Sequence, residues 1–213
     1  MSENSRPIGC VIMASGLARR FGSNKLLADF GGRPLLCRAL DATDIPQLAC
    51  RIVVTRSAEV ETLCQTLGVA CLRHALPGRN DTVRLGLEAL LTLQPGLAGC
   101  IFLPGDQPLL RRETVEALVC AFVADTWTQK ETERAIFRLA FQAENDPEPL
   151  VGSPVLFGCG YFSALRTLPE GKGGSVLLRR YPERVCNVFT ADRAELLDAD
   201  TPEALRQLKQ FLI

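Results

Sequence analysis

Three cationic side chains lie in one loop near the start of the chain. The segment 8–13 is apolar and typical of a buried strand, and the loop 14–25 that follows it carries Arg19, Arg20 and Lys25. Glycines within this loop let the backbone approach a ligand closely, so that backbone N–H groups and the three cations can act on one anion. This chemistry suits a polyanionic ligand, and a nucleoside triphosphate fits it best.

Two well-known phosphate-binding motifs do not fit this loop. A P-loop needs a contiguous Gly-Lys-Ser/Thr, whereas two residues separate Gly22 from Lys25. A dinucleotide-binding loop needs regularly spaced glycines and a later acidic residue, and the spacing of Gly9, Gly16 and Gly22 does not supply them. The loop therefore belongs to a different class of phosphate site.

A carboxylate follows a second apolar run. The segment 100–104 is typical of a buried strand, and it leads into the turn 105–108, Gly-Asp-Gln-Pro, which carries Asp106. Mg²⁺ usually takes only one or two protein carboxylates and completes its coordination with water and phosphate oxygens. We expect Asp106 to anchor Mg²⁺; the alternative is that Asp106 merely caps a turn or the next helix.

Two further carboxylates, Asp198 and Asp200, lie near the end of the chain. Alternation along an extended backbone places them on the same side. Two such groups repel each other unless a cation lies between them or both reach solvent. They are candidate metal ligands, and the alternative for Asp200 is the N-cap of the last helix.

The segment 77–87 combines a glycine turn with the polar first turn of an expected helix. Free amides at such a position favour an anion or a base carbonyl. We expect Arg79 to reach a phosphate and Thr82 to hydrogen-bond a pyrimidine edge or a ribose. The alternative is that Asn80 or Asp81 only caps the helix.

The remaining metal-binding and nucleophilic side chains are interpreted as structural. His74 is the only histidine, and a lone histidine is usually structural. The nine cysteines never come closer than seven positions apart, so no C-x-x-C motif occurs. Several lie in apolar runs, where a free cysteine acts as a small hydrophobe.

Length and charge narrow the protein class. A chain of 213 residues suits one domain, 1–213. Lys plus Arg equals Asp plus Glu at 24 each, so net charge supports neither nucleic acid nor an anionic membrane as partner. No apolar run approaches the ~18 residues of a membrane span, and the start of the chain lacks the sections of a signal peptide, so a cytoplasmic location is expected.

Short apolar runs alternate with helical patterns, which predicts βαβ units and a mainly parallel sheet covered on both faces. The segment 125–150, polar at both ends, is expected to form a variable flap or excursion. The expected strands are 11–13, 52–55, 70–72, 100–104, 135–141, 155–157 and 185–189. The expected helices are 34–42, 58–67, 81–93, 113–123 and 202–212. Ligands of such sheets bind at the carboxyl ends of the strands.

Several of these motifs resemble those of one enzyme family. The first loop is similar to the nucleotidyltransferase signature Leu-Ala-Ala-Gly-x-Ser-x-Arg-x-Gly-x-x-Lys, and the turn 105–108 resembles the Gly-Asp-Met/Gln-Pro motif of molybdopterin cytidylyltransferases, whose Asp binds metal. The segment 198–205 resembles the Asp-x-Asp-Thr-Pro-Glu-Asp-Leu ending of the same family. The residues that match the first signature are Ala14, Gly16, Arg20, Gly22 and Lys25.

The resemblance extends from Met13 to Leu205 and implies membership of the MobA-like NTP transferases. It implies an α/β fold, a three-layer αβα GT-A-like or Rossmann-like nucleotidyltransferase with a mostly parallel sheet. It also implies Mg²⁺-dependent transfer of CMP from CTP to the terminal phosphate of molybdopterin, with release of pyrophosphate. The guanylyl enzymes carry Gly-Gly where this chain has Ala14 and Ser15, which favours a pyrimidine.

The resemblance also assigns roles to residues. Arg20, Lys25 and Asp106 are the expected catalytic residues, and Asp106, Asp198 and Asp200 are the expected metal ligands. The expected nucleotide-binding residues are Ala14, Ser15, Gly16, Arg20, Lys25, Arg79, Thr82 and Gly105. The expected acceptor-binding residues are Gly152, Ser153, Pro154, Lys172, Gly173 and Gly174.

The sequence leaves open which molecule accepts the nucleotide. Ser153 and Ser175 stand where the molybdopterin family has His and Arg. One alternative is a cytidylyl- or guanylyltransferase acting on another phosphorylated small molecule. A second is a non-catalytic chaperone that delivers molybdenum cofactor to an apo-molybdoenzyme.

Overall fold

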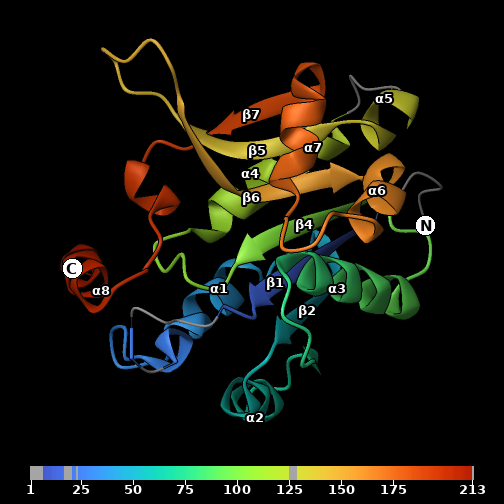
Figure 1. Ribbon diagram of the computed structural model, residues 1–213. Helices are drawn as coiled ribbons and strands as arrows, with labels where there is room; N and C mark the ends of the chain where they lie inside the picture. Colours follow the sequence, from blue (N-terminus) through green and yellow to red (C-terminus); the bar gives the residue numbers. More distant parts are fainter. Residues whose placement is uncertain (1–6, 17–20, 23, 125–128, 213) are drawn as a thin grey trace.

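A seven-stranded sheet forms the middle layer of the structure (Figure 1). The computed structural model describes residues 7–16, 21–22, 24–124 and 129–212. Within these residues the strand order is β3-β2-β1-β4-β6-β5-β7. The strands are β1 (Ile8–Ala14), β2 (Leu48–Thr55), β3 (Cys71–Arg73), β4 (Gly99–Pro104), β5 (Ile136–Phe141), β6 (Leu150–Gly158) and β7 (Val185–Phe189).

Strand direction confirms the predicted, mainly parallel sheet. β1 pairs in parallel with β2 and with β4, β2 pairs in parallel with β3, and β5 pairs in parallel with β7. Only β6 runs against its neighbours β4 and β5. The carboxyl ends of β1, β2 and β4 therefore meet at one edge of the sheet, where ligands of α/β folds bind.

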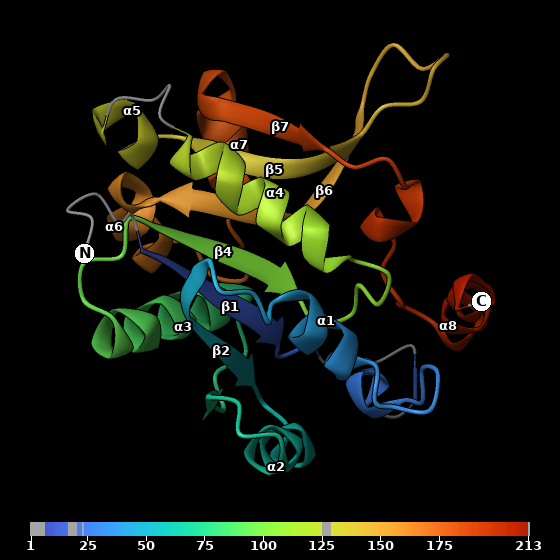
Figure 2. The ribbon, with the colours of Figure 1, turned by 180° about the vertical axis from the view of Figure 1, so that it is seen from behind.

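Helices cover both faces of this sheet. α3, α6 and α7 lie on the face toward the viewer in Figure 1, and α1 and α4 lie on the opposite face, seen in Figure 2. The helices are α1 (Leu36–Ala42), α2 (Ala58–Thr66), α3 (Arg79–Leu93), α4 (Arg112–Val123), α5 (Gln129–Glu133), α6 (Phe162–Arg166), α7 (Ser175–Arg180) and α8 (Pro202–Leu208). This three-layer αβα architecture is the one that the sequence predicted.

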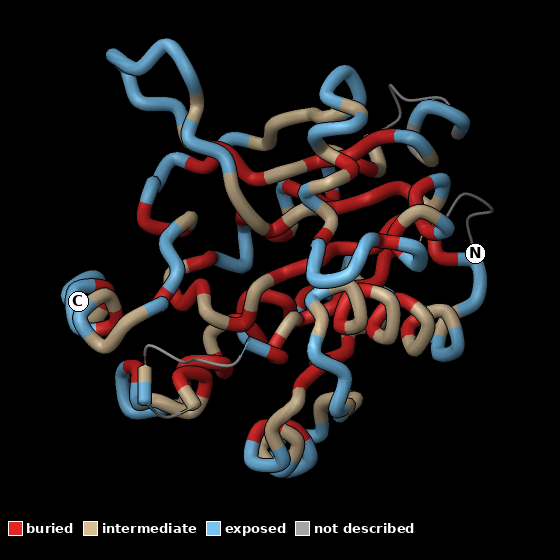
Figure 3. Tube along the Cα trace, viewed as in Figure 1, coloured by how far each residue is buried: buried red, intermediate tan, exposed pale blue. Residues whose placement is uncertain are grey.

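Alternation along β1 divides its side chains between two cores. Ile8, Cys10 and Ile12 pack on the side of α1 and α4, whereas Val11 packs on the side of α3. All four side chains are fully buried, and Figure 3 shows β1 and β4, at the middle of the sheet, as largely buried. Burial on both faces explains why this strand is apolar throughout.

The predicted helix starts are confirmed at two caps. The Ser57 hydroxyl accepts a hydrogen bond from Val60 N at 3.2 Å, and Thr201 caps α8 through Ala204 N at 3.1 Å. Thr201, not Asp200, is thus the N-cap of the last helix. Asp200 is left for another role.

The strand predicted at 135–141, inside the expected flap 125–150, is confirmed. It is β5, which lies between β6 and β7 in the sheet. Ile136, Leu139 and Ala140 are fully buried, so packing and backbone pairing fix this part of the segment in the sheet. Within 142–149, the chain instead projects as the connection between β5 and β6 (Figure 1). Residues 125–128 lie outside the described residues.

The helices of the described residues were compared with the length and hydropathy of a membrane span. None of these helices is long and apolar enough to cross a membrane. All nine cysteines are described, and each is a free thiol.

We expect the substitution Gly86→Ala to destabilise the protein. A Cβ at this position of α3 would lie 2.6 Å from Val11 Cγ1 and 3.0 Å from Val54 Cγ2, and both valines are fully buried. Overpacking of about 1–3 kcal/mol outweighs the gain of about 1 kcal/mol in helix propensity. Urea unfolding should therefore show a loss of about 1 kcal/mol in the free energy of unfolding.

Thr92→Ala, at the exposed end of the same helix, is the control and should change stability by less than about 0.5 kcal/mol. If Gly86→Ala proved as stable as the wild type, close packing of α3 on the sheet would be contradicted.

Candidate functional site

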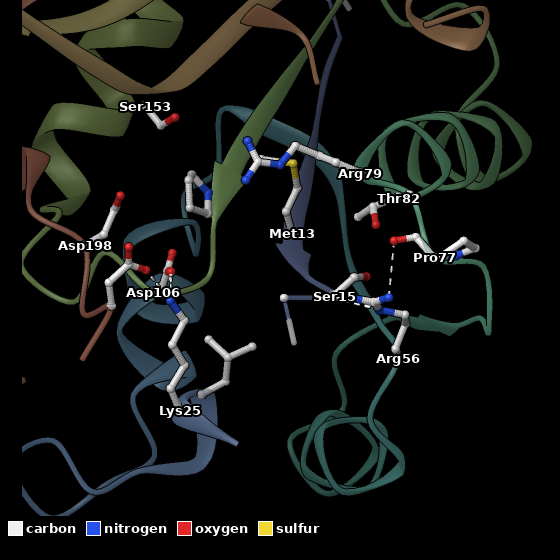
Figure 4. A pocket seen from close by; sticks show the side chains of 15 residues that line it. Met13, Ser15, Lys25, Arg56, Pro77, Arg79, Thr82, Asp106, Ser153 and Asp198 are labelled. Atoms are coloured by element: carbon white, nitrogen blue, oxygen red, sulfur yellow. Dashed lines mark hydrogen bonds and ion pairs between the residues drawn. The ribbon is translucent and has the colours of Figure 1, made fainter. Parts of the chain in front are cut away.

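A cavity of about 590 Å³ opens at the carboxyl ends of β1 and β4. Figure 4 shows its two walls: Lys25, Asp106 and Asp198 lie on one, and Ser15 and Thr82 lie on the other. The lining residues are Met13, Ser15, Gly16, Lys25, Leu26, Arg56, Pro77, Gly78, Arg79, Thr82, Pro104, Asp106, Ser153, Asp198 and Asp200. Most of the residues singled out from the sequence thus meet in one place.

The Lys25 ammonium joins two carboxylates on the first wall. Its Nζ forms an ion pair with Asp106 and lies 2.8 Å from Oδ1 of Asp200. Burial by itself lowers the pKa of Lys25, but Asp106 and Asp200 raise it above its ordinary value. Lys25 therefore stays charged although its side chain is only 11% exposed.

Backbone hydrogen bonds bring three segments of the chain to this wall. Gly105 N donates to Met13 O at 3.0 Å, and Ala199 N donates to Asp106 O at 2.9 Å. A Cβ on Gly105 would lie 3.3 Å from Met13 O, so glycine suits this close approach. The turn after β4 is thereby attached to β1, and the C-terminal segment is attached to that turn.

Asp198 has an unfavourable electrostatic environment. Desolvation in the cavity, followed by the negative charges of Asp106 and Asp200, raises the pKa of Asp198 to about 6. A hydrogen bond from Gln107 acts in the opposite direction. Among the described residues, this wall places three carboxylates beside the ammonium of Lys25, so these four side chains together carry an excess of negative charge.

A buried carboxylate holds the segment that precedes Asp198. Glu195 is only 1% exposed and accepts hydrogen bonds from Arg111 Nη2 at 2.7 Å and from Arg111 N at 3.0 Å. The Thr190 hydroxyl donates to the same carboxylate. These contacts connect the start of α4 to the chain that carries the C-terminal carboxylates.

The opposite wall carries the hydroxyls of Ser15 and Thr82 together with the guanidinium group of Arg56. Ser15 Oγ lies 3.0 Å from Val54 O and 3.0 Å from His74 Nε2. Thr82 Oγ1 lies 3.4 Å from the same nitrogen. Arg56 Nε donates to Ser15 O at 2.8 Å, which holds the start of the first loop against β2.

Of the expected nucleotide-binding residues, Ser15 and Thr82 lie on this wall and Lys25 lies on the first wall, whereas Ala14 and Gly105 are not among the lining residues of the cavity. Gly16 faces open space, since no atom lies within 4 Å of the position that a Cβ would take. Arg79 lines the cavity, whereas Asn80 bonds Gly171 N and Asp81 bonds Gly78 N. Asp81 therefore caps the start of α3, as the alternative predicted. Arg79 and Thr82 nevertheless line the cavity. Arg20, like Arg19, lies outside the described residues.

The expected acceptor-binding residues are only partly brought together. Ser153 lines the cavity, and Gly152 and Pro154 flank it on β6. Gly173 packs against Arg79, since a Cβ there would lie 2.8 Å from Arg79 Cδ. Gly174 packs in the same way on the Phe157 ring, and Lys172 is exposed and is not among the lining residues.

Four residues that support the site were missed in the sequence: Arg56, Gln107, Arg111 and Glu195. Arg56 directly follows β2, so the rule that ligands gather at strand ends could have found it. The pair formed by Arg111 and Glu195 joins residues 84 positions apart. No local sequence pattern indicates that residues so far apart form an ion pair.

The carboxylates of the first wall fit a divalent cation that is also held by phosphate and water oxygens. Among the described residues, no group of three or more His, Cys, Asp or Glu side chains is gathered closely enough to hold one alone. Mg²⁺ needs no such cage, because one or two carboxylates with phosphate and water oxygens suffice. The excess negative charge around Asp198 fits that requirement.

Comparison with known proteins gives one family match and several partial relatives. The family model "MobA-like NTP transferase domain" matches residues 10–185. The bifunctional protein GlmU of Anaeromyxobacter sp. (strain K) is 34% identical over 130 residues, which are 57% of this chain and 26% of GlmU. A probable molybdenum cofactor guanylyltransferase of Pyrococcus horikoshii is 26% identical over 52% of this chain and 54% of its own length.

A third relative is the 3-deoxy-manno-octulosonate cytidylyltransferase of Polynucleobacter asymbioticus, which is 30% identical over 45% of this chain and 39% of its own length. This chain thus spans between about a quarter and about half of these curated relatives.

Solved structures share the fold over nearly the whole chain. Rv0371c from Mycobacterium tuberculosis H37Rv superposes with a TM-score of 0.75 at 22% identity, covering 96% of this chain and 98% of that one. Its complex with manganese superposes with a TM-score of 0.69 at 19% identity, covering 96% and 98%. A CMP:2-keto-3-deoxy-manno-octonic acid synthetase complexed with CTP gives 0.70 at 16% identity, covering 97% of each chain.

We expect Glu195→Gln to loosen the C-terminal segment. The change removes a buried charge that receives hydrogen bonds from Arg111 and Thr190, so it should cost about 1–3 kcal/mol in the free energy of unfolding. The exposed pair of Glu203 and Arg206 supplies the control, and Glu203→Gln should cost less than about 1 kcal/mol. Equal effects of the two changes in urea unfolding would refute the anchoring role of Glu195.

Proposed function

The chain belongs to the MobA-like NTP transferase family, and on this premise we propose that it transfers CMP from CTP to the terminal phosphate of molybdopterin, with release of pyrophosphate. The observation that carries the proposal is the cavity at the ends of β1 and β4. It combines a wall with three carboxylates, which can receive a cation, with an opposite wall whose hydroxyls can receive a base.

Lys25 is suited to hold the triphosphate. Its ammonium already bridges Asp106 and Asp200, so its position is set before any ligand arrives. A preorganised cation stabilises charge that develops during phosphoryl or nucleotidyl transfer, because little reorganisation is required. Arg20 has the same proposed task, and Arg79 reaches the cavity from α3.

Asp106, together with Asp198 or Asp200, would hold Mg²⁺. When bound, this ion neutralises phosphate charge and orients the triphosphate. The manganese complex of Rv0371c supports a divalent cation for this fold. The carboxylates themselves need not transfer a proton in this scheme.

The transfer consists of one in-line displacement. A terminal phosphate oxygen of the acceptor forms a new bond to the α-phosphorus of CTP, and the bond from that phosphorus to the bridging oxygen breaks. The bonding electrons leave with pyrophosphate. Because a phosphate monoester is already ionised near neutral pH, no general base is required. The task of Lys25 and its neighbours is therefore positioning and charge stabilisation.

Ser15 favours a pyrimidine over a purine. Its side chain is 9% exposed and is attached to Val54 and His74, so it occupies space that a second glycine would leave free. The 3-deoxy-manno-octulosonate cytidylyltransferase relative supports the same choice of base. Thr82 is placed on this wall to meet the base or the ribose.

The acceptor is proposed from the family and from the Pyrococcus horikoshii relative. Ser153 lines the cavity beside the wall with three carboxylates, where an acceptor phosphate would have to lie. Ser153 supplies a hydroxyl rather than an imidazole, so acceptor recognition here rests on hydrogen bonding without an added charge.

The direct test is transfer of label from [α-³²P]CTP to molybdopterin in the presence of Mg²⁺. We expect a labelled dinucleotide and pyrophosphate, and we expect Asp106→Asn and Lys25→Met each to lower kcat by about 10²–10³-fold. Asp41→Asn, which alters an exposed ion pair with Arg33, is the matched control and should leave kcat unchanged. Binding of finished cofactor without CTP turnover would instead indicate a chaperone.

A stability measurement tests the metal-binding role of Asp198. Without metal, Asp198→Asn removes one of three mutually repelling carboxylates, so it should raise stability by up to about 1 kcal/mol, or about 2–4 °C in Tm. With Mg²⁺ and CTP, the same variant should gain less Tm than the wild type.

Asp44→Asn, at an exposed pair with Arg51, is the control for this measurement and should leave the ligand-induced gain in Tm unchanged. An Asp198→Asn variant with the full wild-type gain would exclude Asp198 as a ligand.

A further inference from the structure

His74 lies behind the wall that carries the Ser15 and Thr82 hydroxyls, although nothing in the proposed transfer uses it. It follows β3, and His74 N donates to Thr55 O at 3.0 Å, which fixes its backbone against β2. Its Nε2 contacts hydroxyls from two other elements, Ser15 after β1 and Thr82 in α3. One imidazole nitrogen thus connects both hydroxyls of this wall.

The hydrogen bonds around Ser15 determine which atom donates. A hydroxyl carries one hydrogen, and a backbone carbonyl can only accept. The Ser15 hydroxyl therefore donates to Val54 O, and its lone pair accepts from Nε2–H of His74. This places the ring hydrogen on Nε2.

The hydrogen on His74 Nε2 also determines which way the O–H bond of Thr82 points. Because Nε2 is a donor, Thr82 Oγ1 faces it with a lone pair, and the Thr82 hydrogen is directed elsewhere. Thr92, near the end of the same helix, instead donates its hydroxyl hydrogen to Glu88 O at 3.0 Å. Thr82 lines the cavity, so its hydrogen is available to a ligand there.

We propose that His74 is a positioning residue that sets the base preference of the site, because it turns the Thr82 hydroxyl into a fixed donor for a base edge that accepts a hydrogen bond. The inference rests on the proposed function, since it concerns the nucleotide of that site. Cytosine presents two acceptors, N3 and O2, on this edge, whereas uracil presents a donor at N3. A hydroxyl held as a donor toward N3 therefore favours CTP over UTP.

The surroundings of His74 keep this arrangement intact. Burial, followed by the positive charge of Arg56, lowers the pKa of His74, and Arg84 adds to the lowering, while Asp81 and a backbone hydrogen bond with Leu76 act in the opposite direction. The ring is therefore neutral near neutral pH, with one N–H hydrogen to share between the two hydroxyls.

The test compares His74→Leu with His74→Gln. Leu removes the ring donor, so the Ser15 and Thr82 hydroxyls can rotate and serve either base, whereas the Gln amide retains an N–H at a similar distance. In His74→Leu we expect the ratio of kcat/KM for CTP to that for UTP to fall about tenfold, with the change in KM and little change in kcat. In His74→Gln we expect most of the wild-type ratio to be kept.

Equilibrium binding of CTP and of UTP with Mg²⁺, measured by calorimetry, gives the same comparison without turnover. Thr82→Val should lower the preference as His74→Leu does, and Thr92→Val on the same helix is the matched control that should retain it. The assignment is supported, independently of the acceptor, if the preference for CTP falls in His74→Leu and Thr82→Val and is kept in His74→Gln and Thr92→Val.

The outcomes separate this inference from the proposed function. If the wild type prefers CTP and His74→Leu, shown to be folded by circular dichroism, keeps that preference, the role of His74 is overturned while the transferase remains. If the wild type prefers GTP or binds no nucleoside triphosphate, the proposed function fails and this inference fails with it.

Discussion

The site depends on one buried ammonium held by two carboxylates. Lys25 is largely withdrawn from water, and a charge in that position is stable only if opposite charges lie beside it. Asp106 comes from the turn after β4 and Asp200 from the segment before α8, so the ion pairs unite three segments that are far apart in the sequence. The backbone bond from Ala199 to Asp106 keeps these segments in register.

Among the described residues of this wall, carboxylates outnumber cations. Desolvation, followed by the negative charges of Asp106 and Asp200, raises the pKa of Asp198, and the three carboxylates repel one another. Proteins retain such local repulsion at functional sites because rigid surroundings hold the groups together. Here the surroundings are the ends of two central strands and the buried pair of Glu195 with Arg111. A cation with a polyphosphate would relieve the repulsion.

The sequence predicted the layers of the fold because strand and helix periods differ. The run from Ile8 to Ala14 is apolar throughout because both of its faces are buried, and the sequence alone shows the apolar run. The start of α8 was equally visible, because Thr201 and Pro202 form a local cap. The sequence also predicted the strand at 135–141, which is β5, but the place of this strand between β6 and β7 depends on backbone pairing that no local pattern shows.

For the site, the sequence by itself determined the kinds of groups present and their order along the chain: a glycine loop with Lys25, then Asp106, then Asp198 and Asp200. These are local facts about residue type, strand ends and turns. Only the tertiary structure decided which groups touch, namely that Lys25 bridges two of the carboxylates and that His74 contacts the hydroxyl wall. Such contacts join residues as many as 175 positions apart, and their geometry depends on the packing of the whole sheet rather than on any local pattern.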